Sequence, residues 1–409
     1  MHMKEKITRV FRTYGGLVLL GAAGIPIGAV VGVIETFFGR GLLLVSRIRE
    51  QHPLYFIPFL ALAGIFIAYC YMKFGVKSSK GMNLVFEVGR GEENIIPKRL
   101  IPFSILGTWL SNLFGASTGR EGVAMQIGAT FSHWVGRRLP FRDASEIFLV
   151  TGLAAGFAGL FQTPIAAVVF AMGIMTAGVL EYEALIPAFT ASYTACEVSK
   201  ALGLKNAAFT LSVDHTMNVS VFWKMILLGV IFGIVGAAFA WCLKMTKQVM
   251  ADKIKNPIIR IAVVGVVISI CMLILYQGRY SGTGSNLITN SFTRGKIYSY
   301  DWLFKFILTV ISLAAGFQGG EVTPLFAIGS SLGVVLAGIF HMPVELVAAM
   351  GYVSVFAAGT NTFFAPVLIG AEIFGFQYLP HFFVVCTIAY AFNLNKSIYT
   401  LQRINSGGK

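Results

Sequence analysis

Long stretches without a charged residue alternate with short polar segments along most of the chain. With histidine counted as neutral, uncharged windows lie at 13–34, 53–72, 100–119, 147–180, 225–243, 261–278, 322–344, 346–371 and 373–395. Most of these windows reach the roughly 20 residues that a helix needs to cross a bilayer. The pattern therefore predicts an all-α polytopic membrane protein with ten or more membrane segments.

One window, 147–180, is too long for a single ordinary span, and it contains the string Gln162-Thr163-Pro164. Proline lacks a backbone N–H and clashes with the preceding turn, so we predict that a helix breaks here. Many of the 45 glycines also cluster at points where an apolar segment changes character. Irregular backbone at membrane depth is tolerated only where protein shields it or where it lines an aqueous cavity. Broken helices of this kind favour a transport path.

An internal repeat is visible as three pairs of short strings that recur in the same order, at offsets of 203, 200 and 199 residues. The pairs are Gly81-Met82-Asn83-Leu84-Val85 with Gly284-Ser285-Asn286-Leu287-Ile288, Gly119-Arg120-Glu121 with Gly319-Gly320-Glu321, and Gln162-Thr163 with Asn361-Thr362. Such weak symmetry, with glycine-interrupted segments at matching positions, is typical of secondary transporters whose site lies between the repeats.

The repeat and the windows together suggest how the chain is divided, with no separate soluble domain. We expect a cytoplasmic N-terminal segment at 1–12, a first transmembrane half at 13–205, a connection at 206–220, a second transmembrane half at 221–395 and a C-terminal segment at 396–409 that contains Tyr399. Asp214 and His215 make the connection polar.

Composition narrows the class of protein. Hydrophobic residues make up 56% of the chain and charged residues 12%, about half the charged fraction of a soluble protein. This excludes a soluble enzyme, a secreted domain and a disordered scaffold. The 32 Lys and Arg against 18 Asp and Glu lie between the apolar windows, as in loops that orient a membrane protein, and not in one nucleic-acid-binding stripe. Both ends are basic, so we expect both termini in the cytoplasm.

Several strings resemble motifs of the CLC family of chloride channels and proton-coupled anion antiporters. Gly119-Arg120-Glu121-Gly122-Val123 resembles the family's Gly-Arg-Glu-Gly-Pro motif, and Gly319-Gly320-Glu321-Val322-Thr323-Pro324 resembles its Gly-Gly-x-Phe-x-Pro helix start. The segment 281–288 is similar to the glycine-rich loop ahead of that start, and Tyr399 falls where the family has its central tyrosine. The resemblance implies a CLC-type fold of two inverted pseudo-symmetric halves with broken, tilted helices, a homodimer, and a bacterial cytoplasmic membrane.

Departures from the motifs point to one branch of the family. Where most relatives have Gly-Ser-Gly-Ile-Pro, this chain has a methionine, Met82, in place of the serine. Where proton-coupled chloride members carry an inner glutamate, it has Ala171-Met172-Gly173. The combination resembles the fluoride/proton antiporters that export fluoride. Three alternatives stay open: a chloride channel or chloride/proton exchanger of the same fold, more remotely an intramembrane enzyme, and a purely structural or partner-binding membrane protein, which would leave Glu121 and Glu321 unexplained.

Glu121 is the sharpest site candidate, because an ionisable group between long uncharged stretches is costly and is by default functional. As a carboxylate it would occupy an anion position, and once protonated it would leave, so it is predicted to be both gate and proton carrier. The alternative is an ion pair with Arg120. The resemblance implies that helices beginning near Met82, Gly122, Val322 and Tyr399 direct their N-termini at the anion. The predicted anion-binding residues are Met82, Asn83, Gly122, Val123, Val322, Thr323 and Tyr399.

Two further features keep two interpretations each. Glu321 is either part of the proton path or a capping carboxylate, the role favoured at a helix start. The basic residues Lys73, Lys77, Lys80, Arg90, Lys98 and Arg99 either concentrate anions near Met82 or only orient a cytoplasmic loop. The expected substrates are fluoride and protons, and no metal, cofactor or catalytic residue is predicted.

Overall fold

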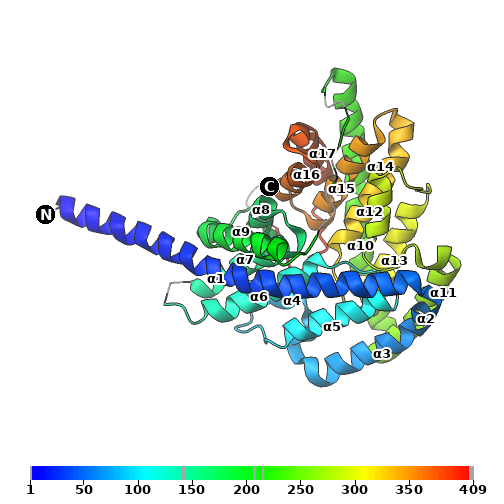
Figure 1. The fold of residues 1–409 in the computed structure, drawn as a ribbon, viewed down its shortest axis with the longest axis horizontal. Helices are drawn as coiled ribbons and strands as arrows, with labels where there is room; N and C mark the ends of the chain where they lie inside the picture. Colours follow the sequence, from blue (N-terminus) through cyan, green and yellow to red (C-terminus); the bar gives the residue numbers. More distant parts are fainter. Residues whose placement is uncertain (1, 141–142, 206–208, 210, 214–215, 405–409) are drawn as a thin grey trace.

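The chain forms an assembly of helices of very unequal length (Figure 1). The computed structural model describes residues 2–140, 143–205, 209, 211–213 and 216–404, and their side chains from residue 15 onward. The α-helices are α1 (His2–Gln51), α2 (Pro53–Phe56), α3 (Leu60–Cys70), α4 (Met82–Gly89), α5 (Leu100–Leu113), α6 (Glu121–Gly136), α7 (Ala144–Phe161), α8 (Pro164–Ile174), α9 (Leu185–Ala201), α10 (Val219–Lys253), α11 (Pro257–Ile274), α12 (Ser285–Phe292), α13 (Asp301–Ala315), α14 (Val322–Phe340), α15 (Val344–Thr360), α16 (Phe364–Phe374) and α17 (Leu379–Ala391). The predicted Asp214 and His215 of the connection lie outside the described residues.

The apolar helices are of two kinds, long and short. Six segments of the described chain are long and apolar enough to cross a bilayer, and five more helices are apolar but only 10–17 residues long. Short apolar helices are expected where a span is broken within the membrane. The prediction of an all-α polytopic protein with several spans is confirmed.

The helix α1 is far longer than the uncharged window that predicts it. It runs without interruption past charged residues such as Arg40 and extends away from the rest of the molecule at its N-terminal end (Figure 1). Gly24, Gly28 and Gly32 form a stripe at four-residue spacing that faces α9, and a Cβ at Gly28 would collide with the carbonyl of Ala191. Small residues let two membrane helices approach closely, so this stripe fixes α1 against α9.

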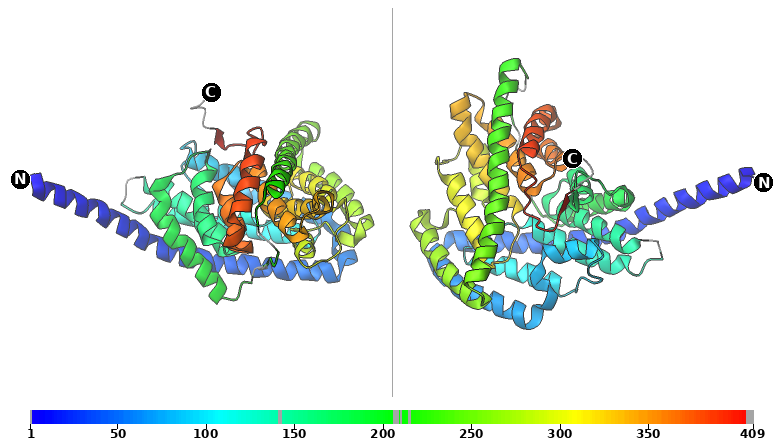
Figure 2. Two further views of the ribbon diagram at one scale, coloured as in Figure 1. Left: turned by 90° about the horizontal axis from the view of Figure 1, so that it is seen from above. Right: turned by 180° about the vertical axis from the view of Figure 1, so that it is seen from behind.

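The internal repeat is visible in the order of the helices. The helices α4 to α8 recur as α12 to α16, with first residues that differ by 200 to 203 positions. The pairs also pack alike: α6 lies against α7 as α14 lies against α15. Each half also has a long helix, α1 or α10, and Figure 2 shows α10 running across the direction of α1.

The predicted helix break is confirmed and occurs in both halves. The helix α7 ends at Phe161, Gln162 takes a left-handed conformation with φ 62°, and α8 begins at Pro164. In the second half α15 ends before Asn361, which has φ 54°, and α16 follows. Asparagine tolerates this conformation better than most residues, and proline fits the first turn of a helix.

Contacts between the halves use the start of a broken helix. The carboxylate of Glu372, on α16, accepts hydrogen bonds from the backbone N–H groups of Ile165 (3.1 Å) and Ala166 (2.8 Å) at the start of α8. A carboxylate at this end of a helix satisfies free donors and the macrodipole. Glu372 is therefore a structural cap that joins the two halves.

The expectation of a helix beginning near Tyr399 is wrong. Residues 398–400 are irregular, and the chain then pairs in parallel as the short strand β2 (Arg403–Ile404) with β1 (Thr176–Ala177). The backbone N–H of Ile398 donates to the carbonyl of Gly359, on α15, at 2.8 Å. That long-range bond fixes the segment without a helix, and only the tyrosine side chain is left to contribute to a site.

Candidate functional site

Glu121 lies at the start of α6, and its carboxylate is bound to the start of α14. The residue is fully buried. Its Oε2 accepts a hydrogen bond from the backbone N–H of Thr323 at 3.1 Å and another from the hydroxyl of Thr323, while Oε1 lies 3.2 Å from Nε of Arg120. The first N–H groups of a helix have no partner inside the helix and lie at the positive end of its dipole. The carboxylate thus occupies a position suited to any small anion.

A reciprocal backbone contact brings the starts of α6 and α14 together. Gly119 and Gly320 form an isolated antiparallel bridge, with N–H···O distances of 2.5 and 2.9 Å. A Cβ at Gly320 would lie 2.9 Å from the backbone nitrogen of Gly122, so a larger residue there would force the turns apart. The turns that precede the corresponding helices α6 and α14 thus bond to each other in both directions.

An open cavity of about 450 Å³, the Met82 pocket, collects four of the predicted site residues. These are Met82, Asn83, Glu321 and Tyr399. The remaining predicted residues, Gly122, Val123, Val322 and Thr323, are buried at the starts of α6 and α14 and do not line this pocket. The structure therefore divides the predicted set into an open group around Met82 and a buried group around Glu121.

Tyr399 borders the Met82 pocket through its side chain. The ring packs against Phe86 of α4 with centroids 5.5 Å apart, and the backbone N–H is hydrogen-bonded to Oγ of Ser397. The hydroxyl is buried and has no hydrogen-bond partner among the described residues. A buried hydroxyl without a partner is costly and is available to a ligand.

Glu321 does not act as the helix cap that the sequence favours. It is the residue before α14, but its side chain makes no capping hydrogen bond. Its Oε1 lies 3.7 Å from Nζ of Lys247, near the end of α10, and Lys244 lines the same pocket. Sequence reasoning missed these two lysines, although they follow directly after the uncharged window 225–243.

The basic residues around Met82 are largely engaged in other contacts. Lys77 pairs with Glu93 at 2.6 Å, and Lys80, which lines the pocket, pairs with Glu87 at 2.6 Å. The hydrogen bond from Lys77 holds the pKa of Glu93 below its usual range, so this carboxylate stays ionised. Lys98 lies 4.0 Å over the ring of Trp134. Most of this cluster therefore orders the segment between α4 and α5.

Five phenylalanines from both halves form a closed circuit beside the first turns of α14. Phe157 contacts Phe161 and Phe170, Phe161 contacts Phe326, and Phe356 contacts both Phe326 and Phe170, with ring centroids 4.8 to 5.4 Å apart. Sequence reasoning did not find this group, because its members come from four helices. The circuit is an apolar wall without hydrogen-bond donors.

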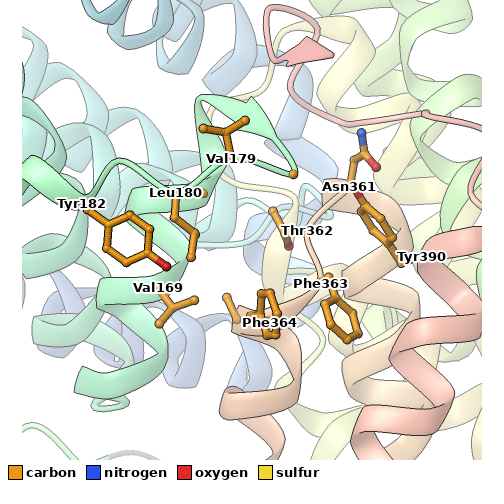
Figure 3. A pocket seen from close by; sticks show the side chains of 12 residues that line it. Val169, Val179, Leu180, Tyr182, Asn361, Thr362, Phe363, Phe364 and Tyr390 are labelled. Atoms are coloured by element: carbon orange, nitrogen blue, oxygen red, sulfur yellow. The ribbon is translucent and has the colours of Figure 1, made fainter. Parts of the chain in front are cut away.

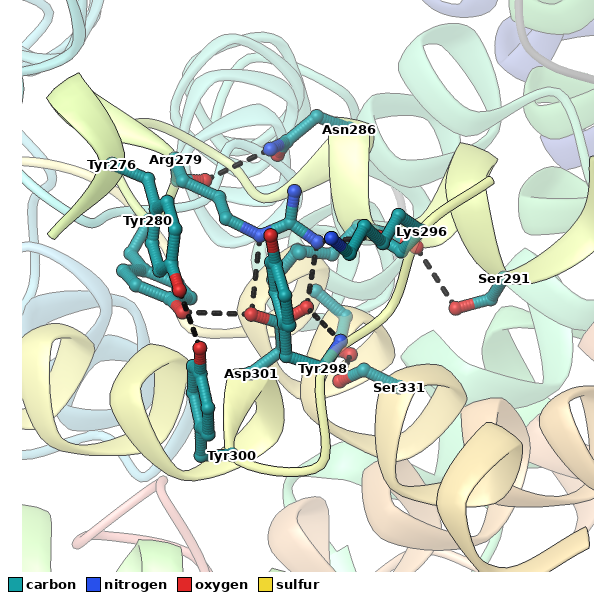
Figure 4. A network of polar contacts seen from close by, with 12 residues as sticks. Tyr276, Arg279, Tyr280, Asn286, Ser291, Lys296, Tyr298, Tyr300, Asp301 and Ser331 are labelled. Atoms are coloured by element: carbon teal, nitrogen blue, oxygen red, sulfur yellow. Dashed lines mark hydrogen bonds and ion pairs between the residues drawn. The ribbon is translucent and has the colours of Figure 1, made fainter. Parts of the chain in front are cut away.

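A polar network surrounds Asp301 at the start of α13 (Figure 4) and continues along that helix to the segment that leads to Glu121. Arg279 pairs with Asp301 at 2.6 Å, and the hydroxyl of Tyr280 donates to Asp301 at 2.7 Å. One turn further along α13, Lys305 donates to Oγ of Ser117 at 2.8 Å and to the carbonyl of Tyr280 at 3.1 Å. Fully satisfied networks of this kind are rigid. The backbone ahead of Glu121 is thereby fixed against the glycine-rich loop 281–284.

A second cavity, of about 380 Å³, lies between the end of α8 and the start of α16 (Figure 3). Phe363 and Phe364 face Leu180 and Tyr182 across it. Gly173, at the position where the resemblance expects an inner glutamate, also lines this cavity. The predicted anion-binding residues do not line it.

Comparison with known proteins gives concordant results. The family model described as "Voltage gated chloride channel" matches residues 63–394. The chain is 31% identical to a chloride/fluoride channel protein of Pseudomonas syringae pv. tomato, over 94% of this chain and 86% of that protein. It matches the crystal structure of a CLC-type fluoride/proton antiporter with a TM-score of 0.94 and 50% identity, covering 96% and 99% of the two chains. A slow cyanobacterial Cl⁻/H⁺ antiporter, at a TM-score of 0.81 and 21% identity over 93% and 96% of the two chains, shares the fold.

Proposed function

The chain belongs to the family of voltage-gated chloride channels, the CLC family, and we propose that it exports fluoride in exchange for protons. The choice of ion is supported by the two similar proteins whose names include fluoride, one of them half identical to this chain. The family consists of membrane channels and transporters, so we propose no catalytic reaction for this chain.

The single observation that carries the proposal is the position of the Glu121 carboxylate at the start of α14. An anion and this carboxylate compete for the same N–H groups. Protonation removes the negative charge and with it the attraction to the helix start, so the protonated side chain gives way to an anion. Return of the carboxylate releases the proton and displaces the anion. One side chain thereby couples the two movements in opposite directions.

The preference for fluoride is assigned to the Met82 pocket. The thioether of Met82 stands where most relatives have a serine hydroxyl that contacts the anion, and it has no hydrogen-bond donor. Its polarizable, adaptable chain fits closely around a small ion. We assign anion contacts to Asn83 and Tyr399 in this pocket, and to Gly122, Val123, Val322 and Thr323 at the helix starts.

The proton reaches Glu121 by a route that we place along Glu321. Its carboxylate lines the Met82 pocket and is 3.7 Å from Lys247, and a Cβ on Gly122 would lie 3.8 Å from its Oε2. Glu321 thus lies between the open pocket and the start of α6. It takes the place of the glutamate that is missing at Gly173.

The wider setting follows from the family and from the charge pattern. We propose a homodimer in a bacterial cytoplasmic membrane, with both termini in the cytoplasm and with the halves divided as 13–205 and 221–395. Each subunit would have its own pathway.

The proposal is tested by ion efflux from liposomes that contain the purified protein. Fluoride or chloride is recorded with a selective electrode while the external pH is followed in the same sample. Fluoride efflux coupled to proton uptake, with chloride much slower, is the expected result. Comparable chloride flux would support the alternative of a chloride transporter of this fold, and chloride flux without proton movement would support a channel. No flux of either ion would refute all three.

A further inference from the structure

An anion that leaves water for the Met82 pocket needs replacement hydrogen-bond donors. Thr323 does not line this pocket and both of its donors are occupied by Glu121, and the thioether of Met82 offers no donor. Unpaired anions are strongly disfavoured in a low-dielectric site. The donors for an anion in this pocket must therefore come from its other lining residues.

Gln126, one and a half turns into α6, supplies an oriented donor. It lines the Met82 pocket and is only 9% exposed. Its Oε1 accepts a hydrogen bond from the hydroxyl of Ser104, on α5, at 3.3 Å. A Cβ on Gly81, the residue before Met82, would lie 3.5 Å from Nε2. The carbonyl end of the amide is therefore anchored, and its NH₂ end lies against the backbone that leads to Met82.

The NH₂ group of Gln126 is available to a ligand. Its Nε2 makes no hydrogen bond within the described part of the chain. Gln318 lines the same pocket but differs in this respect, because its Nε2 donates to the carbonyl of Gly316 at 3.2 Å. Nε2 is reached from the open pocket, so it can donate to water or to an anion that replaces the water.

We propose that Gln126 is a specificity-determining residue whose side-chain N–H hydrogen-bonds to fluoride in the Met82 pocket, which Tyr399 also lines. The inference rests on the proposed function and adds a residue to it. A neutral donor favours the halide that accepts hydrogen bonds most strongly, which is fluoride. Because the amide has no charge, its hydrogen bond to the ion is weaker than one from the ammonium groups of Lys80, Lys244 and Lys247, which line the same pocket.

The test compares two substitutions of the same type in the same pocket. Gln126→Met removes the donor and nearly preserves the shape of the side chain, and Gln318→Met is the matched control. Isothermal titration of each purified protein with fluoride and with chloride gives the affinities, and liposome efflux gives the rates. We expect Gln126→Met to weaken fluoride binding roughly tenfold or more, the effect of losing one hydrogen bond to a charged group, and to change chloride binding much less. Gln318→Met should behave as the wild type.

A second variant guards against misfolding of the first. Ser104→Ala removes the anchor of the amide and leaves the donors, so it should weaken fluoride binding by less than Gln126→Met. Wild-type fluoride affinity in Gln126→Met, or equal losses for both halides, would overturn the inference while leaving the antiport function intact. If Gln126→Met does not elute as a folded protein, wild-type fluoride affinity in Ser104→Ala overturns it instead. A wild-type protein that moves no fluoride would refute the proposed function itself, and this inference with it.

Discussion

The carboxylate of Glu121 accepts a hydrogen bond from the backbone N–H of Thr323, a residue 202 positions further along the chain. Glu121 begins a helix of the first half and Thr323 lies in the first turn of the corresponding helix of the second half. Each half therefore supplies one component of this contact, a carboxylate from the first half and the start of a helix from the second. Neither half alone makes the site. The backbone bridge between Gly119 and Gly320 holds the two turns together.

Replacing Glu121 by glutamine should abolish proton coupling. Glutamine has nearly the same shape but neither takes up a proton nor carries a charge, so fluoride efflux from liposomes is expected to continue without alkalinisation outside. Glu372→Gln is the matched control, because Glu372 caps α8 and takes no part in the proposed exchange. Its coupling ratio should equal that of the wild type. Intact proton coupling in Glu121→Gln would refute the proposed gating role of Glu121.

The hydroxyl of Thr323 should determine how firmly the carboxylate holds its position. Thr323→Val removes this donor without changing the branched shape, at a cost of about 1.5–3 kcal/mol for a hydrogen bond to a charged group. The backbone N–H of Thr323 stays available to an anion, so anions then compete better with the carboxylate, and the number of fluoride ions moved per proton should rise. Simultaneous recording of fluoride and pH measures this ratio. Thr323→Ser keeps the hydroxyl and should retain the wild-type ratio, whereas an unchanged ratio in Thr323→Val would contradict the prediction.

Met82 is expected to exclude chloride because its long side chain fills space that a serine would leave open. Met82→Ser should raise chloride flux relative to fluoride flux, because the shorter side chain leaves room for the larger and more weakly hydrated ion. Met82→Leu has a side chain of similar volume and should preserve the preference for fluoride. Liposome efflux with each halide gives the ratio. Identical selectivity in Met82→Ser and the wild type would remove Met82 from the selectivity mechanism.

Local features of the sequence predict the fold class and the centre of the site. The break at Pro164 follows from the geometry of proline, and the repeat follows from strings such as Gly119-Arg120-Glu121, which mark the start of α6. The resemblance to the CLC family rests on these same strings and is confirmed by the family match.

Long-range contacts account for what the sequence does not predict. The helix expected near Tyr399 is absent because the N–H of Ile398 bonds to Gly359, on another helix. Lys247 reaches Glu321 only because α10 continues well past its uncharged window, and Gln126 becomes significant only through its bond to Ser104. Each of these contacts joins two different elements, so no local sequence pattern within either element predicts it.

Close packing of α14 on α15 gives a final prediction about stability. Gly329 and Gly351 face each other, and a Cβ on Gly329 would collide with the carbonyl oxygen of Gly351. Gly329→Ala should therefore destabilise the protein by about 1–3 kcal/mol, as overpacking does in tightly packed interiors. Gly338, on the same helix, is exposed and has open space around it, so Gly338→Ala should be neutral or stabilising by about 0.5–1 kcal/mol. Thermal unfolding of the two variants in detergent measures the difference. Equal melting temperatures would mean that α14 and α15 separate more easily than their backbone contact implies.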